Sequence, residues 1–200
     1  MRGERLKIAI TGNIGSGKSY VSSLFKELDI PVFDSDREAK RLYDRPEIKQ
    51  LMVNRFGSEI YHEDGTLNRG MMASKVFGDN CALGYVESVL YPALNTYFAE
   101  WAEQQESPYV LYESALIFEK HLEGMFDAVI VVAASEAVRI RRVMTRDRCT
   151  EDQVRARMAL QLPQSEKVTK ADYVIVHEAD DEDEVLMEQI QRIHSELINR

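Results

Sequence analysis

Cysteine is scarce in this sequence: the two present, Cys81 and Cys149, lie far apart and show no Cys-x-x-Cys spacing. We expect both to be reduced thiols, as in a cytoplasmic protein. Long hydrophobic runs are also missing, and none approaches the roughly 20 residues that span a membrane. Met1 leads directly into the first expected strand, which leaves no room for a signal peptide. The sequence therefore predicts a cytoplasmic protein that is not inserted in a membrane.

Positive charge is in deficit. Lys and Arg number 25, whereas Asp and Glu number 34, and the net charge is −9. Nucleic-acid binding depends on neutralising phosphates, so an acidic chain is a poor candidate for it. A guanine-reading Asn-Lys-x-Asp sequence is absent, which argues against a GTP-dependent switch. We see no repeat or low-complexity segment, and no feature indicates an obligate protein partner.

The remaining composition is that of a globular protein. The chain has 200 residues, 44% of them hydrophobic and 30% charged, which suits one domain. Five β-rich runs stand out: Leu6–Thr11, Ile30–Phe33, Tyr109–Tyr112, Ala128–Ala133 and Tyr173–Val176. Several are almost continuously apolar, as expected for strands covered on both faces, and helical stretches lie between them. This alternation predicts an α/β fold, with a five-stranded parallel sheet wrapped by helices.

Residues from about 37 to 107 are too many for one crossover helix, and they contain their own turn signals. We interpret them as a mostly helical subdomain inserted between the second and third strands. Such an insertion usually holds the second substrate, although extra scaffold is the alternative. The core then comprises residues of about 1–36, 108–135 and 170–200.

A glycine-rich loop follows the first strand. It reads Gly12-Asn13-Ile14-Gly15-Ser16-Gly17-Lys18-Ser19, which matches Gly-x-x-x-x-Gly-Lys-[Ser/Thr], and a helical pattern begins at Tyr20. Glycines let the backbone approach a polyphosphate, and the loop N–H groups form an anion nest at a helix N-terminus. Lys18 can reach the β- and γ-phosphates, and the Ser19 hydroxyl can ligate Mg²⁺. The loop predicts nucleoside triphosphate binding.

Two carboxylates, Asp34 and Asp36, follow the second strand. Ligands of open α/β sheets bind outside the carboxyl ends of the strands, so both carboxylates should face the same crevice as the loop. One can accept the proton of an attacking hydroxyl, and the other can hold Mg²⁺ through water. We favour Asp36 as the base and Asp34 as the metal partner of Ser19. The other interpretation is that Asp34 or Ser35 caps the helix that begins near Arg37.

Seven arginines and no lysine lie within nineteen residues after the fourth strand: Arg139, Arg141, Arg142, Arg146, Arg148, Arg155 and Arg157. Arginine grips phosphate oxygens bidentately and keeps its charge. Thr150 and Gln153 form an expected capping box, so a helix, a turn at Arg146 and a second helix would make a lid over residues of about 139–169. We assign Arg146 to the phosphoryl group, and we expect Arg139, Arg141 and Arg155 to be surface residues.

Residues 113–119, after the third strand, place apolar side chains beside a carboxylate. Leu116 and Phe118 could line the acceptor pocket, and they are equally plausible as core residues.

These motifs together resemble the dephospho-coenzyme A kinase family, over nearly the whole chain. They are Gly12–Ser19, Asp34-Ser35-Asp36, Asp64–Arg69, Leu90-Tyr91-Pro92, Glu113–Glu119, Arg146-Asp147 and Ala171–Ile175. The resemblance implies a P-loop kinase fold and transfer of the ATP γ-phosphoryl group to the ribose 3′-hydroxyl of dephospho-coenzyme A, with Mg²⁺. It also implies that Asp36 is the base and Arg146 the lid arginine. Together with Lys18 of the glycine loop, they are the expected catalytic residues.

The resemblance further implies that Asp34, Asp36, Arg69 and Tyr91 bind the acceptor, and that the turn after the last strand lies near adenine. The sequence departs from the family pattern at four places. Asn13 replaces a frequent Gly, Tyr20 a frequent Thr, Tyr91 a common His, and His177 the usual Asn. We include His177 among the ATP-binding residues. The alternatives are another small-molecule or nucleotide kinase of the same fold and, from a different class, a nucleotide-binding switch or ATPase.

Overall fold

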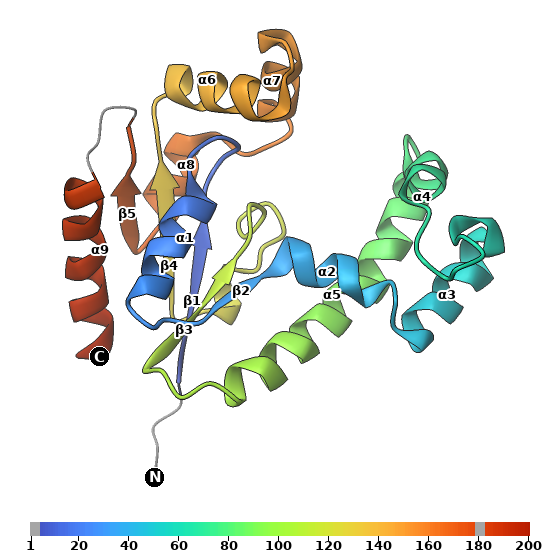
Figure 1. Ribbon diagram of the computed structural model, residues 1–200, viewed down its shortest axis with the longest axis horizontal. Helices are drawn as coiled ribbons and strands as arrows, with labels where there is room; N and C mark the ends of the chain where they lie inside the picture. Colours follow the sequence, from blue (N-terminus) through green and yellow to red (C-terminus); the bar gives the residue numbers. More distant parts are fainter. Residues whose placement is uncertain (1–4, 179–182) are drawn as a thin grey trace. The chain divides into compact units, whose positions relative to one another are not determined.

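The computed structural model describes residues 5–178 and 183–200, and this part of the chain contains a five-stranded sheet. The strands are β1 (Leu6–Thr11), β2 (Val32–Asp34), β3 (Tyr109–Glu113), β4 (Ala128–Ala133) and β5 (Tyr173–Val176). All neighbouring strands are parallel, and their order is β2-β3-β1-β4-β5 (Figure 1). The predicted α/β fold with a five-stranded parallel sheet is therefore confirmed.

Two helices cover one face of the sheet. They are α1 (Lys18–Glu27) and α9 (Asp183–Ile198), which lie side by side in Figure 1. Their buried side chains join alternate strand residues in one apolar cluster, which includes Ile8, Ile10, Phe25, Leu111, Ile130, Ile175, Leu186, Ile190 and Ile193. Burying apolar side chains on this scale is the main force that holds helices to a sheet.

Three more helices follow β4 and precede β5: α6 (Glu136–Asp147), α7 (Glu151–Met158) and α8 (Gln164–Lys170). A short 3₁₀ turn, η2 (Glu123–Met125), precedes β4. The helices α6 and α7 pack on each other around Ile140, Val143 and Val154. In contrast, α8 packs against β4 and covers the sheet, although the sequence placed it within the lid.

The described residues divide into two compact units. Residues up to Asp34 and from Gln105 onward form the first, here called the sheet unit, and Ser35–Gln104 form the second, the helical unit. The helical unit contains α2 (Ser35–Leu42), α3 (Pro46–Phe56), η1 (Ser58–Ile60), α4 (Arg69–Val76) and α5 (Asn80–Glu103). Within the described ranges, no helix combines the length and the apolar composition needed to cross a bilayer.

Local sequence signals explain where the helical unit turns. Asn68 caps α4 by accepting from Met71 N, and Asp79 caps α5 by accepting from two backbone N–H groups. Asp64 bends the chain before α4, because its Oδ1 accepts from both N and Oγ1 of Thr66. Such side-chain caps satisfy the N–H groups that a helix start leaves unpaired. The unit also has its own apolar cluster, built from α3, η1, α4 and α5 around Met52, Ile60, Met72 and Val86.

Candidate active site

The glycine loop lies at the carboxyl edge of the sheet, between the end of β1 and the first residue of α1, Lys18. Gly15 and Gly17 have φ values of 81° and 89°, in the left-handed region that favours glycine. A Cβ atom would collide with the Arg139 carbonyl at Gly15 and with the His177 imidazole at Gly17. The loop therefore depends on glycine at both positions for its conformation and for its close neighbours.

Lys18 and Ser19 converge on one carboxylate at the end of β3. Glu113 Oε1 accepts from Lys18 Nζ at 2.5 Å and from Ser19 Oγ at 2.6 Å. Burial raises the pKa of the Glu113 carboxyl, but the Lys18 charge and the hydrogen bonds from Lys18 and Ser19 outweigh it, so the pKa is lowered overall. Glu113 is therefore held as a carboxylate beside the two side chains that we assigned to phosphate and metal.

Glu113 was not among the site residues that we predicted. Glu113 was expected only within the segment that follows the third strand, and Asp34 was the predicted metal partner of Ser19. Glu113 and Asp34 are in fact register partners at the ends of β3 and β2. An acidic residue that ends a buried strand was the available signal, but its importance depends on β3 lying next to β1.

Hard oxygen ligands are present where the sequence predicted Mg²⁺. The Ser19 hydroxyl and the carboxylates of Glu113 and Asp34 are the donor types that Mg²⁺ prefers alongside substrate phosphates. The direct hydrogen bond between Ser19 and Glu113 brings two of these donors together. These residues therefore fit the ion.

Two hydrogen bonds that involve side chains join the start of the glycine loop to the α7–α8 connection (residues 159–163). Asn13 Nδ2 donates to the Leu162 carbonyl at 2.8 Å, and Ile14 N donates to Gln161 Oε1 at 2.8 Å. The Ile14 side chain also packs into the α6–α7 cluster. The start of the loop is thus held by hydrogen bonds to the segment that connects α7 to α8.

Arg142 of α6 ties the loop to the end of β5. Its guanidinium donates to the carbonyls of Ser16 at 3.3 Å, His177 at 3.0 Å and Glu178 at 3.1 Å. No specific role was predicted for Arg142. Arg139 was expected at the surface, and this is wrong: its side chain is buried, with 6% exposure, and its Nε donates to the Ala134 carbonyl. Arg141 and Arg155 are exposed, as expected.

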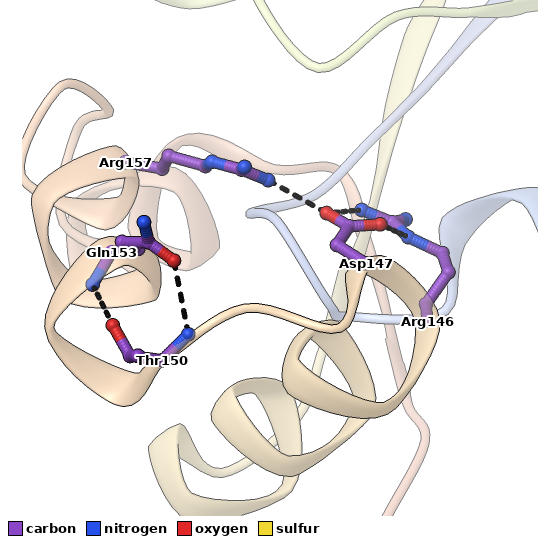
Figure 2. Close-up of polar contacts among 5 residues, drawn as sticks. All are labelled: Arg146, Asp147, Thr150, Gln153 and Arg157. Atoms are coloured by element: carbon purple, nitrogen blue, oxygen red, sulfur yellow. Dashed lines mark hydrogen bonds and ion pairs between the residues drawn. The ribbon is translucent and has the colours of Figure 1, made fainter.

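Arg146 lies in the last turn of α6, rather than in the turn between the helices; Arg148, with φ of 51°, makes that turn. Figure 2 shows the Arg146 guanidinium on Asp147, with Nε 2.7 Å from Oδ1, while Arg157 reaches the same carboxylate at 2.6 Å. The hydrogen bond from Arg146, helped by Arg157, lowers the pKa of Asp147 to about 2. The Arg146 side chain is 64% exposed, so it is oriented by Asp147 without being buried.

The capping box predicted for α7 is present. Thr150 Oγ1 accepts from Gln153 N, and the Gln153 side chain accepts from Thr150 N, as drawn in Figure 2. These reciprocal bonds fix the start of α7, whose N-cap Thr150 lies three residues after Asp147.

Tyr20 and His177, two of the positions that depart from the family pattern, contact each other. Their rings stack with centroids 5.5 Å apart, and Tyr20 Oη donates to Asp183 Oδ1 at 2.6 Å. His177 is further fixed because its backbone N–H donates to the Ala133 carbonyl. The two side chains thus form one aromatic pair beside Gly17.

The two apolar residues predicted to line the acceptor pocket, in the segment after β3 (residues 114–119), differ in burial. Phe118 is buried, with 1% exposure, so it belongs to the core rather than to a pocket surface. Leu116 is half-buried. Of the two apolar residues assigned to the acceptor, only Leu116 is accessible in this structure.

The helical unit brings two predicted acceptor residues near each other. Asp36 is exposed in the first turn of α2, Tyr91 is half-buried on α5, and α2 packs on α5. Burial, together with the charges of Glu87 and Asp36, raises the pKa of Tyr91 to about 12. Arg69 is exposed at the start of α4.

Comparisons with known proteins point to one family. The sequence model of a family described as Dephospho-CoA kinase matches residues 6–183. A protein named Dephospho-CoA kinase from Syntrophotalea carbinolica is 37% identical over 176 residues, covering 85% of this chain and 82% of that protein. Another of that name from Porphyromonas gingivalis is 38% identical over 157 residues, covering 78% and 77%.

Solved structures of similar fold were also found. One from Thermus thermophilus is 34% identical, with a TM-score of 0.84, and the match covers 97% of this chain and 98% of that one. A shikimate kinase from Bacteroides thetaiotaomicron is 16% identical, with a TM-score of 0.52, over 96% and 98% of the two chains, and it supports the P-loop kinase fold alone. The match over residues 6–183 contains both the glycine loop and Glu113. The chain belongs to the dephospho-CoA kinase family.

Proposed function

We propose that this chain transfers the γ-phosphoryl group of ATP to the ribose 3′-hydroxyl of dephospho-coenzyme A, which yields coenzyme A and ADP in the last step of coenzyme A synthesis. The convergence of Lys18 and Ser19 on Glu113 carries the donor half of the proposal. The family match over residues 6–183 supports the acceptor half.

On the donor side, the N–H groups of the glycine loop bind the phosphates, and Lys18 exchanges Glu113 for the β- and γ-phosphates when ATP binds. Catalysis of phosphoryl transfer rests on positioning and on electrostatic stabilisation, so Lys18 and Arg146 act by compensating charge on the transferring group. The Arg146–Asp147 pair, with its exposed guanidinium, suits a residue that is held ready for a ligand. His177 and Tyr20 lie at the adenine end of the site.

On the acceptor side, Asp36 takes the proton of the 3′-hydroxyl as that oxygen bonds to the γ-phosphorus and the bond to the β,γ-bridging oxygen breaks. Tyr91, Arg69 and Leu116 hold the acceptor. The pKa of about 12 for Tyr91 keeps its phenol neutral, so that it serves as a hydrogen-bond donor.

Mg²⁺, when bound, neutralises charge on the β- and γ-phosphates. Ser19 and Glu113 are the residues that would hold it, and Asp34 would do so through water. Glu113 suits this role because its lowered pKa keeps it ionised at neutral pH. We further propose a cytoplasmic location and no nucleic-acid, membrane or obligate protein partner.

The experiment that tests the function is an assay of ADP formation from ATP and Mg²⁺ with purified protein. Dephospho-coenzyme A is compared with adenosine, AMP and GMP, and with water as the blank. We expect strong stimulation by dephospho-coenzyme A alone, and phosphorus NMR of the product should place the new phosphate on the 3′-oxygen. Stimulation by AMP or GMP instead would contradict the acceptor assignment, and ADP formation with no acceptor preference would contradict the kinase assignment.

A further inference from the structure

A lysine of α8 and a glutamate of the segment that follows β3 form a buried ion pair. Lys167 of α8 has 0% exposure, and its Nζ lies 2.6 Å from Glu119 Oε1. The same ammonium donates to the Ala115 carbonyl at 2.9 Å. The pair therefore connects α8 to both ends of residues 114–119, here called the post-β3 segment.

Stability alone is a weak reason for such a pair. Removing two charges from water is costly, and replacing a buried ion pair by apolar residues is often neutral or stabilising. Burial lowers the pKa of Lys167, Glu119 opposes that shift, and the charge of Lys18 lowers the pKa further. Lys167 thus lies within electrostatic reach of the lysine of the glycine loop.

Glu119 extends the connection to the glycine loop. Its Oε1 also accepts from Leu162 N at 3.1 Å, and the Leu162 carbonyl accepts from Asn13 Nδ2 at 2.8 Å. A continuous chain of hydrogen bonds therefore runs from Asn13 through Leu162 and Glu119 to Lys167 and on to Ala115.

The far end of this chain lies next to the site. Ala115 is two residues beyond Glu113, whose carboxylate bonds both Lys18 and Ser19. The glycine loop is consequently tied to the β3 end twice: directly at Glu113, and indirectly through α8 and the α7–α8 connection. If the post-β3 segment were displaced, the adjacent Glu113 would be displaced with it. Small displacements of groups at an active site strongly affect catalysis.

We propose that Lys167 and Glu119 are positioning residues for phosphoryl transfer, which hold the post-β3 segment in register with the glycine loop. This inference rests on the proposed function. ATP binding depends mainly on the loop itself, so it survives loss of the pair. Transfer to the acceptor needs the segment and Glu113 in place, so it falls more than the hydrolysis of ATP by water.

The test is the double variant Lys167→Met/Glu119→Gln. It removes both charges together, so that neither is left buried alone, and the new amide oxygen can still accept from Leu162 N. We expect ATP affinity by calorimetry within about threefold of the wild type, and transfer to dephospho-coenzyme A lower by about tenfold or more, as for loss of a charge-assisted hydrogen bond. The ratio of transfer to hydrolysis should fall.

The matched control is Arg155→Met/Glu136→Gln, which makes a similar change at an exposed pair 2.6 Å apart on the helices above the sheet. It should leave that ratio unchanged. The inference is overturned if the Lys167/Glu119 variant loses transfer and hydrolysis in parallel, as a merely less stable protein would, or if it loses neither.

Lys167→Gln/Glu119→Gln is the second variant, because its two neutral amides can keep hydrogen bonds to Ala115 and Leu162 without a buried charge, and it decides the matter if the Lys167→Met double variant does not fold. A smaller fall in the same ratio supports the inference, and an unchanged ratio overturns it. Wild-type protein is assayed first. If it ignores dephospho-coenzyme A, the proposed function fails, and the ratio is then measured with the acceptor that it does use.

Discussion

The sheet unit and the helical unit hold their candidate residues in opposite ways. In the sheet unit, the glycine loop is fixed by backbone conformation and by ties to Glu113, Gln161 and Arg142. In the helical unit, Asp36 and Arg69 project from the first turns of short helices and are exposed. Triphosphate groups are the same in every donor, so a rigid backbone cradle suits them, whereas an acceptor is distinguished by side chains.

The largest effect on activity is expected for Lys18→Ala, in the sheet unit. The substitution removes the only lysine of the glycine loop and leaves Glu113 buried without its cationic partner. We expect kcat to fall by about 10³-fold or more, since charge on the transferring group loses its compensation. Steady-state ADP formation measures the effect, and circular dichroism checks that the variant is folded. Near-normal kcat would remove the loop from the mechanism.

Asp36→Asn tests the residue of the helical unit that we propose as the general base. If Asp36 is the base, kcat falls by about 10²–10⁴-fold, while ATP affinity stays near that of the wild type. Asp34→Asn is the matched variant, because Asp34 ends β2 in the sheet unit, two residues earlier. A much larger loss in Asp34→Asn than in Asp36→Asn would reverse the two assignments. Both kcat values come from the same coupled ADP assay.

Local patterns made much of the site predictable. Strand, glycine loop and helix are contiguous in sequence, and so are the two halves of the Thr150–Gln153 capping box. Each of these motifs is formed by a few residues that are neighbours in the sequence, so their side chains and backbone groups are necessarily close in space. The apolar stretches likewise indicated the strands closely, because a strand buried on both faces has little freedom in composition.

The rest of the site depends on contacts between residues far apart in sequence. Lys18 and Glu113 are 95 positions apart, Arg142 and Ser16 are 126 apart, and Ile14 and Gln161 are 147 apart. Such pairs follow from strand order and helix docking, which apolar runs do not reveal. Arg139 was misassigned for a related reason. A charged residue is usually exposed, but the carbonyl of Ala134, the residue after β4, gives its guanidinium a buried partner.

Two glycines with left-handed backbone conformation, one in each unit, allow a direct test of whether the glycine loop has a special role in ATP binding. Gly17 in the loop and Gly78 in the helical unit have φ values of 89° and 75°, and a Cβ atom at Gly78 would meet nothing within 4 Å. Substitution by alanine should cost each variant about 1–2 kcal/mol of folding stability through the left-handed backbone. Only Gly17→Ala also pushes on His177, so only it should weaken ATP binding, by roughly tenfold or more.

Denaturant unfolding and calorimetric titration with ATP separate these two effects. A loss of stability in both variants, larger in Gly17→Ala because its Cβ also meets His177, with ATP affinity lost in Gly17→Ala alone, would support the view that the loop is shaped for its ligand. If Gly78→Ala weakened ATP binding as much as Gly17→Ala does, the special role of the loop backbone would be contradicted.

The smallest expected effect concerns Tyr91, which stands where the family commonly has His. With a pKa of about 12, its phenol stays protonated throughout the working pH range, so it adds no step to the pH–rate profile. Tyr91→His introduces a group with a reference pKa of about 6.5, which the nearby Asp36 carboxylate should raise. Below that raised pKa, the imidazolium pairs with Asp36 and makes it a weaker base.

We therefore expect kcat/KM for the acceptor in Tyr91→His to be depressed at low pH and to rise through a new step between about pH 6 and 8, with a total change within about tenfold. Tyr91→Phe is the control, because it removes the hydroxyl without adding a titratable group. Coinciding profiles for the two variants would mean that residue 91 does not act on Asp36. A step in Tyr91→His alone would support our proposal that both residues belong to one acceptor site, in which side chains rather than backbone groups contact the ligand.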